Sequence, residues 1–282
     1  MKPGIYDISN EEYHASEGIS RSAIAAIAKS PLHYYEQYVL LNGLIEKPTD
    51  AMNFGTAVHC LILEDNFDEH FAVVEQFDAR TKEGKQYIEE FMRASEGKII
   101  LTRSEYNTAL AMQQAVLSHP RAMKLIENAL IEKSLYWNDP ITGSLCKARP
   151  DGFKPDLGIV FDIKTTYDSS ASSFQRSIID FDYHIQAAMQ LDAIKAVTDY
   201  KINDFIIIAV PKKSLYSYSP YLYHFTEEII EFGREEYIKG LELIKRCTGK
   251  NEWQRDRHTV IPVYLLPYLR NSKFNSLLEI YQ

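Results

Sequence analysis

Two carboxylates and an amine in the middle of the chain have a spacing that suits metal-assisted hydrolysis. Asp162 and Lys164 lie two residues apart in a strand-like run, so both side chains project from one face. Asp151 lies on the preceding predicted strand, and a hairpin of this length brings its carboxylate beside Asp162. Carboxylate oxygens bind Mg²⁺, which lowers the pKa of a bound water and neutralises charge on a phosphodiester. Because a lysine can orient or deprotonate that water, the three residues indicate phosphodiester hydrolysis.

Spacing alone leaves a structural explanation open, because Asp-x-Lys strands and Asp–Gly turns are common in proteins. His59 could supply an imidazole ligand from an apolar helix, although a buried helical histidine more often belongs to the core. Glu132, on the strand before the carboxylate hairpin, is a further acidic candidate. Tyr183, Gln186 and Gln190 follow at helical spacing and form a polar stripe. That stripe either lines the same cleft or faces solvent.

A sheet and several helices must position these side chains, and the sequence predicts both. Ser20 is expected to cap the first helix, Pro31 to open the second, and Ser104 to cap a third that ends near a proline. Further helices are expected over 52–65, 79–94, 181–197 and 227–247. Strands are expected over 134–139, 144–153, 159–166, 204–210 and 221–225, the first three antiparallel, with a short extended piece at 98–101.

Composition restricts the class of protein. The 282 residues carry a net charge of −8 and are 45% hydrophobic and 25% charged, which is typical of a soluble globular protein. The longest apolar run, 205–210, is too short to span a membrane, and no secretory signal is evident. We therefore expect a cytoplasmic protein with no membrane partner. Cys60, Cys146 and Cys247 are scattered, which argues against a disulfide framework and against an iron–sulfur cluster.

The order of the elements predicts one α/β domain over residues 1–282. Within it we expect a helical N-terminal part over 1–130 and a core over 131–245. A C-terminal helix and tail are expected over 246–282.

Six short motifs follow one another along the chain. They are ISRSA with a later SP (19–31), NFGTAVH (53–59), RTKEG (80–84), RPDG (149–152), FDIKT (161–165) and YHIQ (183–186). In this order they resemble the PD-(D/E)XK nuclease superfamily, and within it the catalytic domains of exodeoxyribonuclease VIII (RecE-type) exonucleases. The resemblance covers most of the chain. It implies a restriction-endonuclease-like α/β (α+β) core, with a mixed central sheet flanked by helices.

The resemblance also implies roles for individual residues. His59, Asp151 and Asp162 match the metal ligands, and the backbone carbonyl of Ile163 joins them. Lys164 matches the catalytic lysine. Two residues of the following helix match the motif that supports the site and contacts the DNA end; they are Tyr183 and Gln186.

By the same resemblance, the expected activity is Mg²⁺-dependent digestion of linear double-stranded DNA from the 5′ end, with Mn²⁺ able to substitute. A RecT-like annealing protein would use the 3′ strand that remains, in recombination systems of bacteria or their prophages. A ring-shaped homo-oligomer, a tetramer in our expectation, would surround the DNA. Two alternatives stay open. One is a RecB/Cas4-like nuclease that acts on single-stranded or flap DNA, and the other is a DNA-end-binding module without catalysis.

Several other side chains are weaker candidates for contacts with DNA. Phosphate contacts are expected from basic residues in two motifs, namely Arg80, Lys82, Lys85 and Arg149. Tyrosines near one hairpin either stack on unpaired bases or, as we favour, pack on a sheet; they are Tyr216, Tyr218, Tyr221 and Tyr223. Basic residues near the C-terminus either line a channel or face solvent; they are Lys245, Arg246, Lys250, Arg255 and Arg257.

Overall fold

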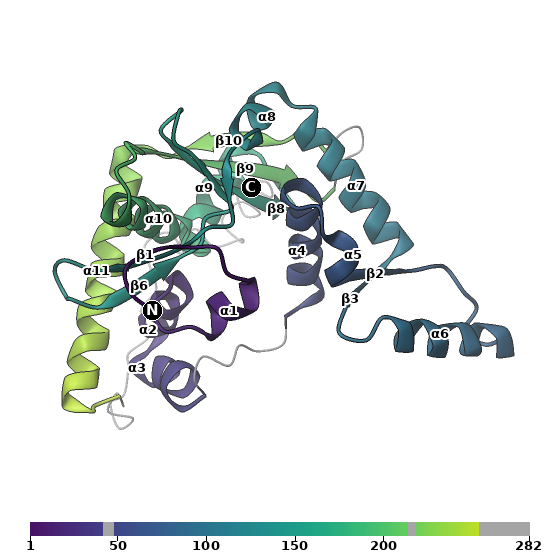
Figure 1. Cartoon of the computed structure of the whole chain (residues 1–282), viewed down its shortest axis with the longest axis horizontal. Helices are drawn as coiled ribbons and strands as arrows, with labels where there is room; N and C mark the ends of the chain where they lie inside the picture. The colour runs from purple at the N-terminus through teal and green to yellow at the C-terminus, as the bar shows by residue number, and fades with distance from the viewer. Residues whose placement is uncertain (42–47, 214–217, 254–282) are drawn as a thin grey trace, which may run out of the picture.

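A mixed five-stranded sheet forms the centre of the structure (Figure 1). The computed structural model describes residues 1–41, 48–213 and 218–253. From edge to edge the strands are β10 (Tyr221–His224), β9 (Asp204–Pro211), β8 (Ile159–Thr166), β7 (Gly152–Lys154) and β4 (Leu130–Ile131). β8 and β9 are parallel, whereas the other neighbours are antiparallel. The predicted α/β fold with a mixed central sheet is therefore confirmed.

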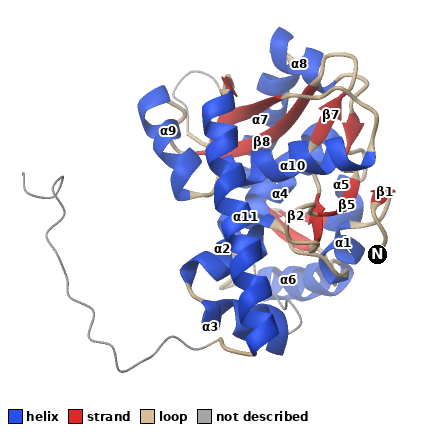
Figure 2. Ribbon diagram, turned by 90° about the vertical axis from the view of Figure 1, so that its left-hand side faces the viewer, coloured by secondary structure: helices blue, strands red, loops and turns tan. Residues whose placement is uncertain are grey.

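Helices cover both faces of this sheet. One face carries α10 (Tyr183–Val197) and α11 (Glu227–Lys250), which lie in front of the strands in Figure 2, and the other carries α4 (Asp50–Leu63), α7 (Arg103–Leu117) and α8 (Pro120–Ile126). Alternate residues of β9 serve the two cores, Ile207 on the α10 side and Ile208 on the α4 side. Asp162 pairs with Ile207, so Asp162 and Lys164 face α10.

Smaller elements surround the central layers. A three-stranded sheet consists of β1 (Gly4–Tyr6), β5 (Ser134–Asn138) and β6 (Leu145–Ala148), with α1 (Asn10–Ala15), α2 (Arg21–Lys29), α3 (Pro31–Tyr34) and a π-helix over Tyr35–Leu40 nearby. Further from the centre lie α5 (Phe67–His70), the parallel pair β2 (Phe71–Val74) and β3 (Ile99–Thr102), and α6 (Lys82–Ala94), which Figure 1 shows projecting to the right. α9 (Ala171–Asp180) follows β8. Across the described ranges, every helix is too short or too polar to cross a membrane.

Most of the expected elements are present. Ser20 caps α2 by accepting a hydrogen bond from the N–H of Ala23, and Pro31 is the first residue of α3. The helices predicted at 52–65, 181–197 and 227–247 correspond to α4, α10 and α11. The single domain and its three parts stay predictions; β1, from the expected N-terminal part, pairs with β5, and residue 246 lies inside α11.

Three details were predicted wrongly. The strand expected over 144–153 is broken into β6 and β7, which belong to different sheets. Pro150 lies in the break, where it has no N–H to offer a sheet ladder. Ser104 does not cap α7; Thr102 does, in a capping box with Glu105. Finally, α9 was not predicted, because its serine-rich sequence is typical of a loop.

Candidate active site

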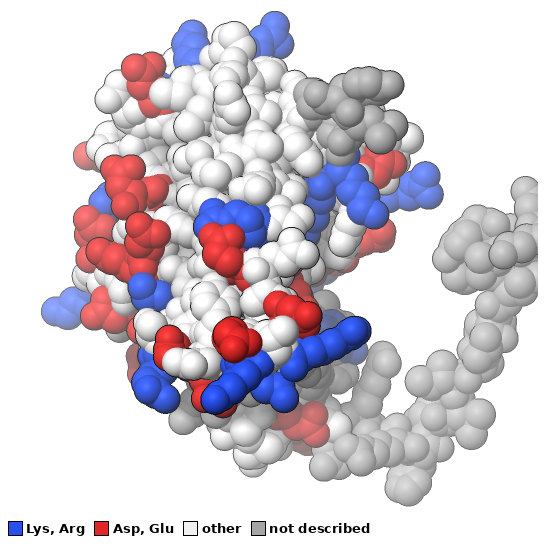
Figure 3. All heavy atoms as spheres, turned by 90° about the vertical axis from the view of Figure 1, so that its right-hand side faces the viewer, with Lys and Arg blue, Asp and Glu red and all other residues white. Residues whose placement is uncertain are grey.

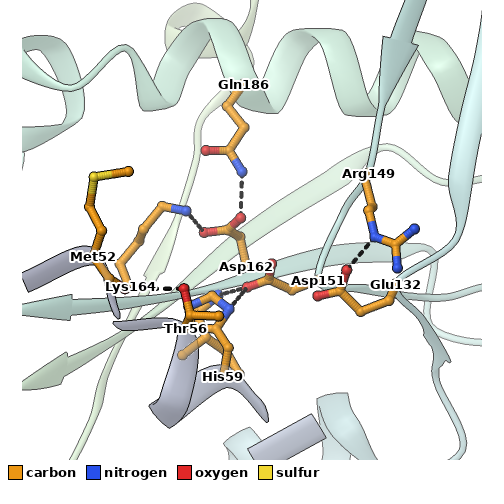
Figure 4. Close-up of polar contacts among 10 residues, drawn as sticks. Met52, Thr56, His59, Glu132, Arg149, Asp151, Asp162, Lys164 and Gln186 are labelled. Carbon is orange, nitrogen blue, oxygen red and sulfur yellow. Dashed lines mark hydrogen bonds and ion pairs between the residues drawn. The ribbon is translucent and has the colours of Figure 1, made fainter. Parts of the chain in front are cut away.

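Asp162 lies in the centre of a polar cluster on the α10 face of the sheet (Figure 4). It is 1% exposed, and its Oδ2 lies 2.5 Å from Nζ of Lys164, two residues along β8. Its other oxygen accepts a hydrogen bond from Nε2 of Gln186 on α10. The period of two that placed Asp162 and Lys164 on one face is thus realised, and the first turn of α10 meets them there.

Asp151 occupies the point where the two sheets separate. β7 pairs with β8 only as far as Gly152 opposite Phe161, which leaves the next N–H along β8, that of Ile163, without a strand partner. The Asp151 carboxylate accepts that N–H at 2.6 Å. A Cβ on Gly152 would overlap the Phe161 ring, so glycine is required for this close approach.

His59 and Glu132 complete the acidic end of the cluster. Nδ1 of His59, on α4, lies 3.2 Å from Oδ2 of Asp151. Glu132 follows β4 with φ 51° and donates its N–H to the Asp151 carbonyl at 3.1 Å. Its carboxylate accepts a hydrogen bond from Nε of Arg149 at 2.6 Å, and Arg149 also donates to Ser134 Oγ at 2.7 Å. The side chains of Glu132 and Arg149 are therefore fixed in place.

The donor atoms of this cluster fit a divalent cation. One ligand atom each from His59, Glu132 and Asp151 lie within 4.8 Å of one another. Two carboxylates and an imidazole suit Mg²⁺ or Mn²⁺. Oδ2 of Asp162 is also buried and, among the described residues, meets only the Lys164 ammonium. The structure thus brings Glu132 beside His59 and Asp151, while Asp162 lies against Lys164 and Gln186. Metal binding by His59, Asp151, Asp162 and the Ile163 carbonyl stays a prediction.

Burial and close charges shift the pKa values of the cluster in opposite directions. Burial would lower the pKa of His59, but the adjacent Asp151 carboxylate outweighs it and raises that pKa to about 9. Burial disfavours the Asp151 carboxylate as well, yet the charge of His59 lowers its pKa overall. Burial and the Asp151 charge raise the pKa of Asp162, despite Lys164. The pKa of Lys164 is raised by Asp162 and Asp151 against its burial, so the amine is an ammonium without metal.

The family model of a PDDEXK-like domain of unknown function (DUF3799) matches residues 20–256. The chain belongs to this family. No curated protein matches the sequence of this chain significantly.

Among solved structures, this PDDEXK-like domain is similar to a "Putative exonuclease" from Eubacterium rectale, with a TM-score of 0.60 and 13% identity over 95% of this chain and 99% of that one. At this identity the likeness shows the fold alone. A phage related exonuclease from Haemophilus somnus 129PT (TM-score 0.33, 10% identity, 75% of this chain, 100% of that one) is more distant. So is the alkaline exonuclease LHK-Exo from Laribacter hongkongensis (TM-score 0.28, 16% identity, 62% of this chain, 89% of that one).

The polar stripe predicted on α10 of the PDDEXK-like domain divides into three environments. Gln186 reaches Asp162, as described above. The Tyr183 ring lies beside Lys164, whose Nζ is 5.2 Å from the ring centroid, a cation–π distance. Gln190 is 3% exposed and so does not face solvent, and its Oε1 is buried without a hydrogen bond among the described residues. The stripe therefore contributes two residues to the site.

The predicted phosphate contacts lie in two different settings. Arg80, Lys82 and Lys85 are exposed around the start of α6. Figure 3 shows basic side chains among acidic ones in its lower part, at the level of α6, below a broad uncharged band. Arg149, in contrast, is held against Glu132. Nothing in the spacing of Glu132 and Arg149 along the chain signalled this pair, because their contact depends on how two sheets meet. DNA contacts by all four residues stay predictions.

The remaining candidates are the tyrosines near one hairpin and the basic residues near the C-terminus. Most of those that the structure describes make packing or hydrogen-bond contacts within the fold. Tyr218 and Tyr223 pack against the cores, as we favoured, and Tyr223 stacks on Phe174 with ring centroids 4.5 Å apart. Tyr221 is 55% exposed. Lys245 donates to the Thr142 carbonyl at 2.6 Å. Of the other candidates, Arg246 and Lys250 line a hollow beside the end of α2, and Tyr216, Arg255 and Arg257 lie outside the described residues.

Proposed function

We propose that the chain is a metal-dependent nuclease that digests linear double-stranded DNA from its 5′ ends. The observation that carries the proposal is the buried Asp162–Lys164 pair, next to a His59–Asp151–Glu132 cluster of metal-binding side chains. Membership of a PDDEXK-like family and the fold shared with the Eubacterium rectale protein called an exonuclease support it.

The side chains divide the work of phosphodiester hydrolysis. When bound by His59, Asp151 and Glu132, a divalent cation supplies charge neutralisation and a water of lowered pKa. Lys164, held as an ammonium, donates hydrogen bonds to a phosphate oxygen or to the attacking water and stabilises the charge of the transition state. Gln186 fixes the Asp162 carboxylate that in turn holds Lys164. We assign Lys164 an orienting rather than a proton-accepting role, because its carboxylate neighbours raise its pKa.

The finer parts of the proposal follow from the motifs. We take Mg²⁺ as the working metal, with Mn²⁺ as a substitute, and we place the enzyme in the cytoplasm of a bacterium that carries a prophage or of a phage-infected cell. A RecT-like annealing protein is the proposed user of the 3′ strand in recombination. A ring-shaped homo-oligomer, in our proposal a tetramer, would let a subunit of net charge −8 follow DNA through a basic channel.

A linear duplex labelled separately at its 5′ and 3′ ends tests the proposal. It is incubated with the protein in Mg²⁺ or in EDTA, and a covalently closed circle serves as the control. We expect early loss of the 5′ label, in Mg²⁺ only, and an intact circle. Cleavage of the circle, or of single strands only, would favour the RecB/Cas4-like alternative. Binding of ends without any cleavage would favour the inactive module.

A further inference from the structure

An aromatic and basic cluster lies at the ends of β8 and β9, outside the residues assigned so far. Tyr167 directly follows β8 and is 68% exposed, more than any other large hydrophobic side chain among the described residues. Lys212 and Lys213 directly follow β9. The two strand ends are joined, because the N–H of Lys212 donates to the Thr166 carbonyl at 2.6 Å. Tyr167 and the two lysines are thus neighbours because they follow the paired ends of the parallel strands β8 and β9.

The two ammonium groups lie close to the tyrosine ring. Nζ of Lys212 is 5.5 Å from the ring centroid of Tyr167, and Nζ of Lys213 is 5.7 Å from it. Lys212 is also 5.7 Å from the ring centroid of Phe54, on α4, and its Nζ lies 3.5 Å from the Ala51 carbonyl. Lys212 therefore connects α4 to the strand ends, whereas Lys213 is exposed. Both ammonium groups thus lie near the Tyr167 ring, and the ring stays exposed.

This cluster adjoins the active site along two elements. Tyr167 comes three residues after Lys164, just past the end of β8, which corresponds to roughly 10 Å along the strand direction. Phe54 lies on α4, the helix that supplies His59. A strand of DNA that has one phosphate at Lys164 and passes around the end of β8 would bring a neighbouring nucleotide to Tyr167.

The chemistry of the cluster matches a nucleotide. Exposed aromatic rings stack on unpaired bases, since every base has a π-face, and lysine ammonium groups pair with the phosphates on either side. Within duplex DNA the faces of a base are covered by its stacked neighbours, so an unpaired nucleotide fits better. The carboxylates of the adjacent site would repel the same phosphates, and the positive charges of the two lysines would offset this repulsion.

We propose that Tyr167, Lys212 and Lys213 form a subsite for an unpaired nucleotide next to the scissile phosphate, with its base stacked on Tyr167 and its phosphates at the lysines. This inference rests on the proposed nuclease function, which it extends to a specific contact with the separated strand.

Binding of a short fluorescent oligothymidylate, followed by anisotropy in EDTA, tests the subsite without hydrolysis. Tyr167→Ala is expected to weaken binding roughly tenfold, within the range known for loss of one base–aromatic stack. Tyr167→Phe should bind as wild type does. Lys213→Ala should reduce the slope of log affinity against log salt by about one. Tyr200→Ala, which changes another partly exposed tyrosine (44%), is the matched control and should have no effect.

A set of oligonucleotides with one abasic position each makes the test specific. If Tyr167 stacks on a base, Tyr167→Ala loses its effect on the oligonucleotide that lacks this base. Equal affinity of Tyr167→Ala and wild type for every oligonucleotide would overturn the subsite, as would an equal loss on all of them. Thermal melting of Tyr167→Ala verifies that the variant is folded. Failure of wild type to cleave any DNA in Mg²⁺ would refute the nuclease proposal separately, because the binding measurements need no cleavage.

Discussion

The Asp151 carboxylate accepts the backbone N–H of Ile163 at 2.6 Å, in the middle of the Asp162–Lys164 pair. This bond takes the place of the next rung of the β7–β8 ladder, so the carboxylate is aligned by the sheet itself. The second neighbour of Asp151, His59, comes from a helix on the opposite face. His59 from the α4 face and the Asp162–Lys164 pair on the α10 face therefore meet Asp151 at one edge of β8. This edge is free for Asp151 because β7 ends there.

Replacing Lys164 tests its assigned role most directly. Lys164→Ala should reduce cleavage of end-labelled duplex by roughly a hundredfold or more, because the developing negative charge loses its nearest donor. DNA-end binding, measured by anisotropy, should be largely retained. Lys239→Ala is the matched control, since Lys239 makes only surface ion pairs. Cleavage by Lys164→Ala at the wild-type rate would show that Lys164 has no catalytic role.

Gln186 is predicted to act through Asp162. Gln186→Ala should lower kcat by roughly 10–100-fold, as is usual when a hydrogen-bonding support of a site is lost, and should leave KM little changed. Gln186→Glu should be at least as damaging, because it places a carboxylate against the buried Asp162 oxygen. Steady-state kinetics on linear duplex DNA measures kcat and KM for each variant. A rise in KM with constant kcat would instead assign Gln186 to substrate binding.

The histidine–aspartate contact predicts how stability depends on pH without metal. The folded pKa of His59, about 9, exceeds the ordinary value of 6.5. Its contribution is therefore complete below pH 6.5 and is lost as pH rises through about 9. At 1.36 kcal/mol per pKa unit, its upper bound is about 3 kcal/mol. Unfolding by urea in EDTA should show this decline, and His59→Gln should flatten it. An unchanged slope in His59→Gln would contradict the assignment.

Glu132 should report metal binding. Burial, followed by the Asp151 charge, raises its pKa to about 7, so its protonation stabilises the metal-free fold and this contribution is lost between about pH 4.5 and 7. A bound cation removes the repulsion between the carboxylates. We expect Mn²⁺ to raise the melting temperature of wild type, and to do so less in Glu132→Gln and Asp151→Asn. Glu96→Gln, an exposed control, should respond as wild type does. An equal response of all four proteins would remove these residues from the metal site.

Gly152 offers a prediction about stability. Gly152→Ala forces a methyl group into the Phe161 ring and should lower the free energy of unfolding by about 1–3 kcal/mol. Gly55→Ala is the matched control: its new Cβ would lie 3.6 Å from Thr165 Oγ1, an ordinary contact, within α4. There alanine should be neutral or stabilising by about 0.5–1 kcal/mol. Urea titration distinguishes the two, and equal stability of both variants would refute the packing argument.

The sequence predicted the parts of the site that depend on short-range periodicity. Asp162 and Lys164 follow from the strand repeat, whereas the helical stripe left solvent exposure of Gln186 open and its role came only from the resemblance. The pair of Glu132 with Arg149 could not be predicted this way, because it joins the ends of two sheets. The single strand expected over 144–153 overlooked Pro150, which cannot donate a hydrogen bond to a sheet ladder. The cap at Thr102 was missed because Ser104 is an equally suitable residue type two positions later.

Arg149 also donates a hydrogen bond to the carbonyl of Ile8, a residue 141 positions earlier in the chain. The guanidinium that fixes Glu132 is thus itself anchored by the segment between β1 and α1. A deletion that removes Ile8 would take this acceptor away from Arg149 and so disturb the acidic cluster from a segment 141 positions distant in the sequence. The geometry of the candidate metal site therefore depends on a backbone carbonyl that belongs to neither of the two sheets.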